Sequence, residues 1–374
     1  MTHQFFLFDM DGVLLRPKGY HHALQASVKR VGIALGAPNT ELNEDQIARF
    51  EALDVTNEWD SLAISTALIL IHIWEVNPDV RLNGLVPHPE IITRSKPDFD
   101  LFLDRFSSSV TLPGHSAYQF LLKEHLWLSG EQQSHLSIIL HHCRDIFKSP
   151  TLPGHQETVL GSRVFEDNYR LTSQLNMDSY LLKFDRPLIE KKQKDSLYDW
   201  LTDPNHHAGI MTNRPSSTPP GYLSSPEAEL GAKLVGFDDL PVLGSGMLAW
   251  YAVNQHKIPD FTFLKPNPVH ALALLQMAMG VPPIKALDIA ADLWLGESGE
   301  NEWVFMNNAR LTIFEDAAKG LRCGIAAKEL LANIGIGIDL NLIGVTQNPI
   351  KYRALQNIAD RVVSGIKDIQ WNEI

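Results

Sequence analysis

One segment near the N-terminus decides the fold: Phe5-Phe6-Leu7-Phe8-Asp9-Met10-Asp11-Gly12-Val13. Its first part is apolar, rich in aromatic residues and free of turn formers, which is typical of a buried strand in a parallel sheet. Two carboxylates and a glycine follow where this strand is expected to end. In doubly wound α/β sheets, ligands bind at this carboxyl edge. We therefore expect a ligand site around Asp9 and Asp11.

The chemistry of this expected site follows from the closeness of the two carboxylates. Two like charges so near each other are unfavourable unless a cation lies between them or one of them is held protonated. The pattern therefore favours Mg²⁺, with one aspartate free to attack and the other free to transfer a proton. The alternative is an ordinary Asx-type turn that ends in Gly12.

Length, composition and charge limit the class of protein. A chain of 374 residues suits two domains, or one domain with a large insertion. The net charge of −12 argues against nucleic acid and against an anionic membrane surface as partners. Cys143 and Cys323 are the only cysteines, so a reducing, cytoplasmic setting is expected. The longest apolar run, Leu62 to Trp74, is too short to span a bilayer. The oligomeric state stays open.

The organisation of the chain changes twice. Residues 16–187 show helical periodicity with little strand character, and predict an inserted α-helical cap. The core is expected in two pieces, 1–15 and 188–374, where short apolar segments alternate with helices. This alternation predicts a doubly wound parallel (Rossmann-like) sheet. Within the cap we expect a Pro/Asn/Gly-rich loop over about 77–97 and, among others, helices over 98–106, 115–128, 131–147 and 168–183.

A short echo occurs inside the predicted cap. Residues 111–115 and 151–155 both read Thr-Leu-Pro-Gly-His. Because Pro-Gly is a strong turn signal, the simpler interpretation is two similar turns. The alternative is that His115 and His155 face one pocket.

Further polar residues follow the later segments of the predicted core. Thr212 follows the strand at 208–211, Lys265 opens a helix, and Glu315 and Asp316 follow the strand at 311–314. Taken singly, these residues have ordinary explanations as a helix cap, a surface charge and the acidic first turn of a helix. Together, and in this order after Asp9 and Asp11, they indicate one site.

This set resembles the haloacid-dehalogenase-like (HAD) superfamily, subclass I. The resemblance implies that Asp9 is the nucleophile and Asp11 the general acid/base, in the motif that Gly12 continues. It also implies that the Thr212 hydroxyl and the Asn213 backbone amide hold the transferring phosphoryl group. Lys265 matches the basic residue that clamps the nucleophile and the phosphate.

The segment Phe314-Glu315-Asp316-Ala317-Ala318-Lys319-Gly320 resembles the metal-binding motif of the same superfamily. Ala317 stands where that family often has Ser, and no acid follows at Gly320. The resemblance therefore implies a Mg²⁺ site that rests on Asp9, the Asp11 carbonyl and Asp316, with Glu315 secondary.

The function that this resemblance implies is phosphate transfer. We expect an enzyme, a Mg²⁺-dependent phosphatase that hydrolyses a small phosphorylated metabolite or sugar phosphate through an aspartyl-phosphate. The nearest alternative is a phosphomutase with the same pair of aspartates. A catalytically silent sensor of a phosphate ligand is the alternative from another class, although a sensor needs no nucleophile.

Four residues at two places in the predicted cap are weaker candidates for substrate contact. His21 lies ten residues beyond Asp11 and resembles a histidine that phosphomutases place near the acid/base; a structural hinge histidine is the alternative. Asn57, Glu58 and Trp59 begin a predicted helix, whose free N–H groups suit an anionic or hydroxyl-rich ligand. The alternative is a capped helix with Trp59 packed in the cap.

Overall fold

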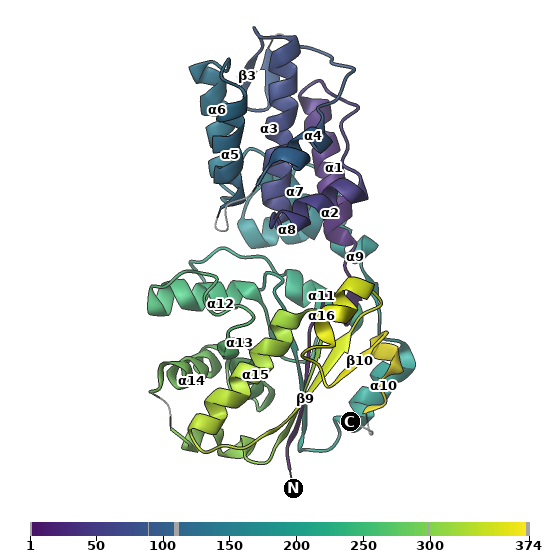
Figure 1. The fold of residues 1–374 in the computed structure, drawn as a ribbon, viewed down its shortest axis with the longest axis vertical. Coiled ribbons are helices and arrows are strands. Elements are labelled where there is room, and N and C mark those ends of the chain that lie inside the picture. The colour runs from purple at the N-terminus through teal and green to yellow at the C-terminus, as the bar shows by residue number, and fades with distance from the viewer. Residues whose placement is uncertain (1, 89, 108–111, 298, 372–374) are drawn as a thin grey trace. The chain divides into compact units, whose positions relative to one another are not determined.

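The computed structural model describes residues 2–88, 90–107, 112–297 and 299–371, which form two compact units (Figure 1). The core unit comprises Met1–Pro17 and Asp185–Ile374. The helical unit comprises Lys18–Phe184. The chain therefore leaves the core two residues later, and returns to it three residues earlier, than the boundaries of 15 and 188 expected from the sequence.

The core unit contains a sheet of six parallel strands in the order β7-β6-β1-β8-β9-β10. Numbered along the chain, this order is 3-2-1-4-5-6, which is that of a doubly wound sheet. The predicted fold class is confirmed. The strands are β1 (Gln4–Phe8), β6 (His206–Met211), β7 (Val242–Leu243), β8 (Arg310–Glu315), β9 (Asp339–Val345) and β10 (Arg361–Val363).

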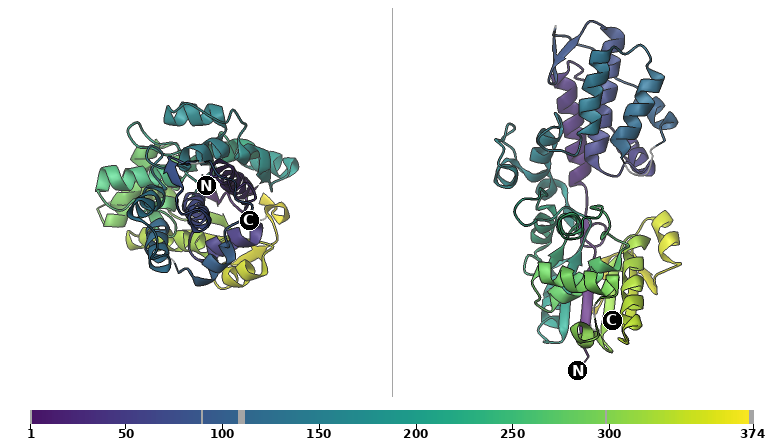
Figure 2. Two further views of the ribbon diagram at one scale, coloured as in Figure 1. Left: turned by 90° about the horizontal axis from the view of Figure 1, so that it is seen from above. Right: turned by 90° about the vertical axis from the view of Figure 1, so that its left-hand side faces the viewer.

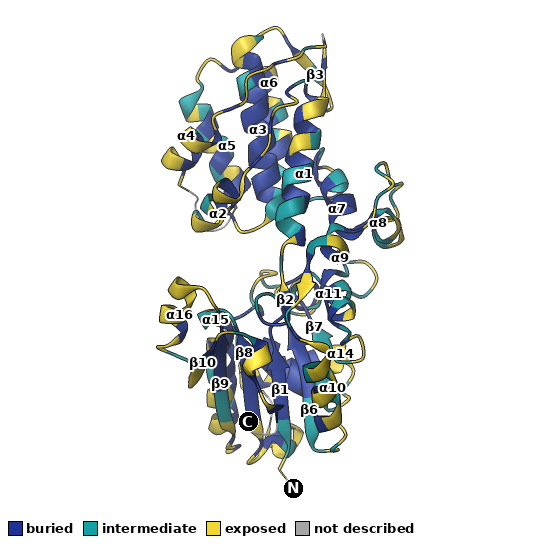
Figure 3. Cartoon of the chain, turned by 90° about the vertical axis from the view of Figure 1, so that its right-hand side faces the viewer, coloured by how far each residue is buried: buried dark blue, intermediate teal, exposed yellow. Residues whose placement is uncertain are grey.

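The alternation of side chains along β1 explains why the whole strand is apolar. Phe5 and Leu7 pack on one face of the sheet against α13 (Pro268–Ala278), α14 (Pro283–Leu295) and α15 (Ala318–Asn333). Phe6 and Phe8 pack on the other face, against α10 (Lys191–Trp200) and α11 (Glu227–Val235). Successive residues of a strand point to opposite faces, so a strand covered on both sides must be apolar at every position. Figure 3 shows the buried strands between helices whose outer surfaces are exposed.

Two further helices begin near the carboxyl edge of the sheet. They are α12 (Ser245–Tyr251), which follows β7, and α16 (Pro349–Leu355), which follows β9.

The helical unit is built around α3 (Glu58–Val76), which packs on α1, α5 and α6 (Figure 2). By length and composition alone α3 is long and apolar enough to cross a membrane, and is longer than the predicted apolar run. However, 78% of its most apolar window is buried inside the protein. The other helices described in this unit are α1 (Gly19–Ala34), α2 (Glu44–Ala52), α4 (Phe99–Arg105), α5 (Pro113–Glu124), α6 (Gly130–His141), α7 (Leu152–Leu160), α8 (Ser162–Tyr169) and α9 (Tyr180–Phe184).

The prediction of one continuous helix over 168–183 is wrong for residues 170–179, whereas its two ends are helical in α8 and α9. Helix α8 ends at Tyr169, because Arg170 adopts a left-handed backbone with φ of 57°. The carboxylate of Glu157 then accepts hydrogen bonds from the backbone N–H groups of Gln174 and Leu175, at 2.9 and 2.8 Å. These groups are bound by a side chain far away in the sequence, so the segment up to α9 is not helical.

Two short ribbons add strand structure that the sequence did not indicate. β3 (Arg81–Asn83) and β4 (Val86–His88) form an antiparallel pair within the predicted loop over 77–97. β2 (Leu15–Arg16) pairs antiparallel with β5 (Arg186–Pro187) in the core unit. This second ribbon joins the chain that leaves the core to the chain that returns to it.

The two copies of the sequence echo are starts of helices with Pro in the first turn. Thr111 of the first copy lies outside the described residues. His115 is exposed and its ring lies against that of His141, with the ring centroids 4.3 Å apart. His155 is buried and its Nδ1 lies 3.1 Å from the Ser27 hydroxyl. The two histidines thus have different surroundings, which favours two similar turns over a shared pocket.

Candidate active site

The register of the parallel sheet brings the predicted residues together. Phe8 of β1 lies opposite Ile210 of β6 and Phe314 of β8, so Asp9 leaves the sheet beside the end of β8. The Asp9 backbone N–H donates to the Phe314 carbonyl oxygen at 2.9 Å. The direction of winding reverses at β1, between β6 and β8, and such a switch point is where doubly wound folds bind ligands.

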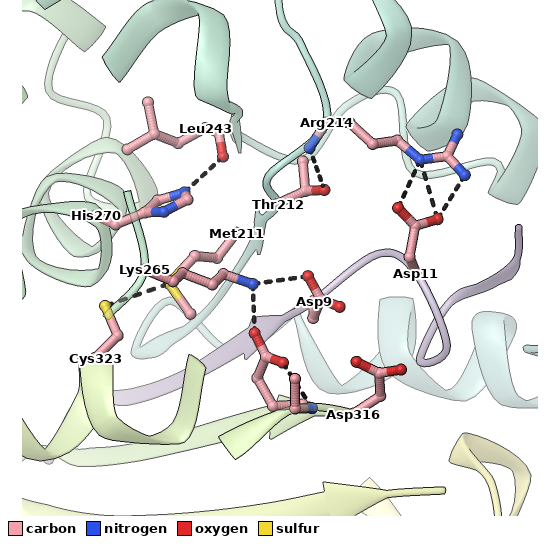
Figure 4. A network of polar contacts seen from close by, with 12 residues as sticks. Asp9, Asp11, Met211, Thr212, Arg214, Leu243, Lys265, His270, Asp316 and Cys323 are labelled. Carbon is pink, nitrogen blue, oxygen red and sulfur yellow. Dashed lines mark hydrogen bonds and ion pairs between the residues drawn. The ribbon is translucent and has the colours of Figure 1, made fainter. Parts of the chain in front are cut away.

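Lys265 joins two of the carboxylates at this edge (Figure 4). Its ammonium donates to Asp9 Oδ1 at 2.7 Å and also to Glu315 Oε1, and all three side chains are buried. Burial alone would lower the pKa of Lys265, but the two carboxylates outweigh burial and raise it. Lys265 is therefore charged and fixed against one oxygen of Asp9.

Asp9 remains in a strongly negative environment despite Lys265. Burial raises its pKa well above the ordinary value, and Glu315, Asp316 and Asp11 raise it further against the opposing effect of Lys265. Burial also raises the pKa of Glu315, with Lys265 opposing. The predicted nucleophile thus sits where negative charge exceeds the positive charge that side chains provide.

Three carboxylates could hold a metal ion here. One oxygen each of Asp9, Glu315 and Asp316 lies within 4.8 Å of the others. An all-oxygen donor set of this kind fits Mg²⁺. Gly12 adds to the fit: it adopts φ of 83°, and a Cβ there would lie 2.3 Å from Asp316 Oδ2. A side chain at Gly12 would therefore displace Asp316 from the group.

The two acids that follow β8 differ in how their oxygens are used. Glu315 is buried, with Oε1 bound by Lys265 and Oε2 accepting from the Ala317 backbone N–H at 3.2 Å. Asp316 is more accessible and pairs through Oδ2 with Lys351 at the start of α16. Because both Glu315 oxygens already have protein donors, this geometry favours Asp316 as the main ligand.

Thr212 and Asn213 follow β6 at the same edge of the sheet. Thr212 is buried, and its Oγ1 accepts from the Arg214 backbone N–H at 3.1 Å, so the hydroxyl hydrogen is available to another acceptor. Asn213 is exposed. The segment is placed by a bond from the Thr212 backbone N–H to the Leu243 carbonyl oxygen at 3.1 Å.

Sequence reasoning missed the residues that hold Asp11. Figure 4 shows Asp11 turned toward Arg214 rather than toward Lys265. The Arg214 guanidinium binds Asp11 and Asp185, and Asp185 is completely buried. The only signal was that Arg214 follows the predicted Thr212 and Asn213 directly. Asp185 gave none, because it lies at the boundary predicted between two domains.

The predicted cap residues lie in the helical unit. His21 Nδ1 and Nε2 lie 3.1 Å from carboxylates of Glu44 and Glu51 on α2, and the hydrogen bond to Glu51 raises the pKa of His21. His21 thus links α1 to α2 within this unit. Its role near the acid/base stays a prediction.

The predicted capping at α3 is only partly present. Asn57 is the N-cap residue by position, but its side chain makes no capping hydrogen bond among the described residues. Glu58 and Trp59 are half-buried. Asp60, in the first turn of the same helix, is buried and bound by Arg144 at 2.7 Å. A contact of Asn57, Glu58 or Trp59 with substrate stays a prediction.

Comparisons with known proteins add to the description of the fold. No family model and no curated protein sequence matches this chain. Northeast Structural Genomics Consortium target ZR25, known from an X-ray structure, matches with a TM-score of 0.68 and 14% identity over 98% of this chain and 97% of that one. Phosphatase Tt82 from Thermococcus thioreducens matches with a TM-score of 0.44 and 12% identity over 94% of this chain and 99% of that one. At 14% identity the first likeness concerns the fold alone, and the second is too distant to support an argument.

Proposed function

We propose that this protein is a Mg²⁺-dependent phosphatase that hydrolyses a small organic phosphomonoester through an aspartyl-phosphate. One observation carries the proposal. At the switch point of the sheet, Lys265 binds one oxygen of buried Asp9, while Asp11, two residues on, is held separately by Arg214. A nucleophile and a proton-transfer group of the same residue type thus have different surroundings, which two-step phosphoryl transfer requires.

In the first step, a carboxylate oxygen of Asp9 attacks phosphorus. A bond forms between Asp9 and phosphorus as the bond from phosphorus to the ester oxygen breaks. The proton of Asp11 passes to that ester oxygen, and the alcohol leaves. Lys265 stays bound to Asp9 Oδ1, so its charge lies beside the reacting carboxylate and stabilises the negative phosphoryl oxygens.

In the second step, Asp11 acts as a base. Its carboxylate takes a proton from water while the water oxygen attacks phosphorus. The bond from phosphorus to Asp9 breaks, and inorganic phosphate is released. The Thr212 hydroxyl is suited to donate to a phosphoryl oxygen in both steps, since its own oxygen is already fixed by the Arg214 backbone.

Asp9 and Asp316, with Glu315 as a secondary ligand, would hold the Mg²⁺ ion. The resemblance to the HAD-like superfamily adds the Asp11 carbonyl oxygen to this set. When bound, the ion supplies positive charge to the phosphoryl oxygens. The arrangement also suits the resemblance to the HAD-like superfamily, in which Gly12 continues the nucleophile motif.

The test is a panel of phosphorylated metabolites and p-nitrophenyl phosphate, assayed for phosphate release with Mg²⁺ and with excess chelator. We expect release from at least one small monoester with Mg²⁺ only. Absence of release across the panel, with ester binding intact, would favour the silent sensor. A burst of phosphoenzyme from a sugar bisphosphate, followed by transfer to a monophosphate, would show a phosphomutase.

A further inference from the structure

Arg214 is the most enclosed cation near the proposed site, with a side chain only 2% exposed. Its Nε lies 3.0 Å from both carboxylate oxygens of Asp11. Its Nη2 donates to Asp11 Oδ1 at 2.5 Å and to Asp185 Oδ2 at 2.8 Å. We propose that Arg214, held in place by Asp185, is a positioning residue that fixes the orientation of the acid/base Asp11. The inference rests on the proposed phosphatase function.

The contact orients Asp11 and does not protonate it. An arginine guanidinium keeps its protons at any pH at which a protein works, so Arg214 supplies direction and charge only. Two nitrogens converge on Oδ1 of Asp11, whereas Oδ2 receives only the shared Nε. Oδ2 therefore has more capacity left for the proton that moves to the leaving group. Asp11 is also 34% exposed, so a substrate or water can reach it.

Arg214 is itself fixed by its backbone. Its N–H donates to the Thr212 hydroxyl oxygen, and its carbonyl oxygen accepts from the Ser245 N–H at 2.9 Å at the start of α12. Gly244 allows this close approach, because a Cβ there would lie 2.7 Å from the Arg214 carbonyl oxygen. The guanidinium thus transmits the position of the Thr212 segment to Asp11.

Asp185 connects this arrangement to the place where the chain re-enters the core unit. It is the first residue of the returning segment, and its side chain is fully buried. The next two residues pair with Leu15–Arg16, and the Leu188 N–H donates to the Leu14 carbonyl oxygen at 2.8 Å. Arg214 therefore clamps the loop that carries Asp11 and the returning chain together.

The consequence is specific for esters with poor leaving groups. An alkyl alcohol leaves only when an acid protonates it, whereas p-nitrophenolate leaves without that help. Correct placement of a general acid contributes about 10²–10⁴-fold to a rate. Loss of the Arg214 clamp should therefore lower kcat/KM for an alkyl phosphate roughly 10- to 100-fold more than for p-nitrophenyl phosphate.

The experiment compares Arg214→Lys and Asp185→Asn with wild type on a series of monoesters, from p-nitrophenyl to alkyl phosphate, in Mg²⁺. Arg214→Lys keeps the charge but loses the paired contact. Asp185→Asn keeps the size of the side chain but removes the charge that holds Arg214. Asp11 itself is unchanged, so any effect on it must pass through Arg214. Arg310→Gln is the matched control, because it removes a surface ion pair with Asp339 in the same unit. Thermal melting of each variant establishes that it is folded.

We expect kcat/KM to depend more steeply on the leaving group in both test variants than in wild type, and more so in Arg214→Lys than in Asp185→Asn. The control should show the same dependence as wild type. A dependence parallel to wild type in folded variants would overturn the positioning role and leave the phosphatase proposal intact. Failure of wild type to release phosphate from any ester would overturn both. If Arg214→Lys does not fold, Asp185→Asn alone decides the outcome.

Discussion

Each unit of the molecule buries an aspartate: Asp60 near the start of a helix in the helical unit, and Asp9 at the end of a strand in the core unit. The two aspartates differ in how far side-chain cations balance their charge. In the helical unit, Asp60 is bound by Arg144, and the Cys143 thiol donates to its other oxygen at 3.2 Å. One negative charge meets one positive charge, and both oxygens have donors. In the core unit, Asp9 shares a single lysine with Glu315.

The difference becomes clear when charges at the edge of the sheet are counted. Among the described residues that form ion pairs or the carboxylate group at this edge, five carboxylates meet three side-chain cations. With all eight groups ionised, two negative charges remain, which one divalent cation would balance. The carboxylates are Asp9, Asp11, Asp185, Glu315 and Asp316, and the cations are Lys265, Arg214 and Lys351. A buried carboxylate that has its own cation needs no further ligand to balance its charge. An excess of carboxylates at one sheet edge instead marks a candidate functional site.

The largest expected effect comes from removing the charge that we assign to the nucleophile. Asp9→Asn should lower phosphate release by at least about 10⁴-fold, because an amide cannot form the aspartyl-phosphate. Since burial and the neighbouring acids already disfavour ionised Asp9, the melting temperature in metal-free buffer should not fall. Near wild-type release by the folded variant would show that Asp9 is not the nucleophile.

The second prediction tests the excess of negative charge directly. Dialysis against a chelator should abolish phosphate release, and added Mg²⁺ should restore it. Asp316→Ala should raise the Mg²⁺ concentration for half-maximal activity more than Glu315→Ala does, roughly 10-fold or more. Calorimetric titration of Mg²⁺ into each variant measures the same ranking without turnover. The reverse ranking would show that the two acids have exchanged roles.

The sequence predicts a residue of the candidate site when a local sequence pattern places that residue, and misses it when a contact between distant residues does. Asp9 and Asp11 could be found because an apolar strand and its end are local patterns, and the register of parallel strands then brings Glu315 beside Asp9. Arg214 and Asp185 could not be found in this way. They lie 29 residues apart in the sequence, and no periodic pattern predicts the contact between them.

The same limit explains the errors in the helical unit. The segment at 170–179 has a composition that allows a helix, but Glu157 binds its backbone N–H groups from another helix. The β2–β5 ribbon likewise pairs residues that are far apart in the chain. Periodicity reports which face of an element is apolar, and it carries no information about a partner elsewhere in the sequence.

A third prediction asks whether the balanced charge of the helical unit is structural. Arg144→Gln leaves the buried Asp60 carboxylate without its cation, which should lower the free energy of unfolding by about 3 kcal/mol. Arg163→Gln, on α8 of the same unit, is the control for loss of a charge. Urea unfolding followed by circular dichroism measures both. An effect on Arg144→Gln no larger than on the control would remove the contrast between Asp60 and Asp9.

The smallest expected effect concerns His155, a buried group that the helical unit keeps neutral. Burial and the nearby Arg30 lower the pKa of His155 to about 3, whereas an unfolded chain titrates near 6.5. As the pH falls below about 6.5, the unfolded state gains a proton that the folded state does not, so stability decreases. At pH 5.5 the loss from this residue should approach about 1.4 kcal/mol relative to neutral pH.

The two copies of the Thr-Leu-Pro-Gly-His sequence supply a matched pair for this test. His155→Gln should reduce the loss of stability between pH 7.5 and pH 5.5, measured by urea unfolding, because glutamine takes up no proton. His115→Gln alters the exposed histidine of the other copy and should follow wild type. Equal pH dependence in wild type and His155→Gln would mean that His155 is protonated inside the folded unit. The helical unit would then also contain a buried charge without a partner, and charge balance would no longer distinguish the two units.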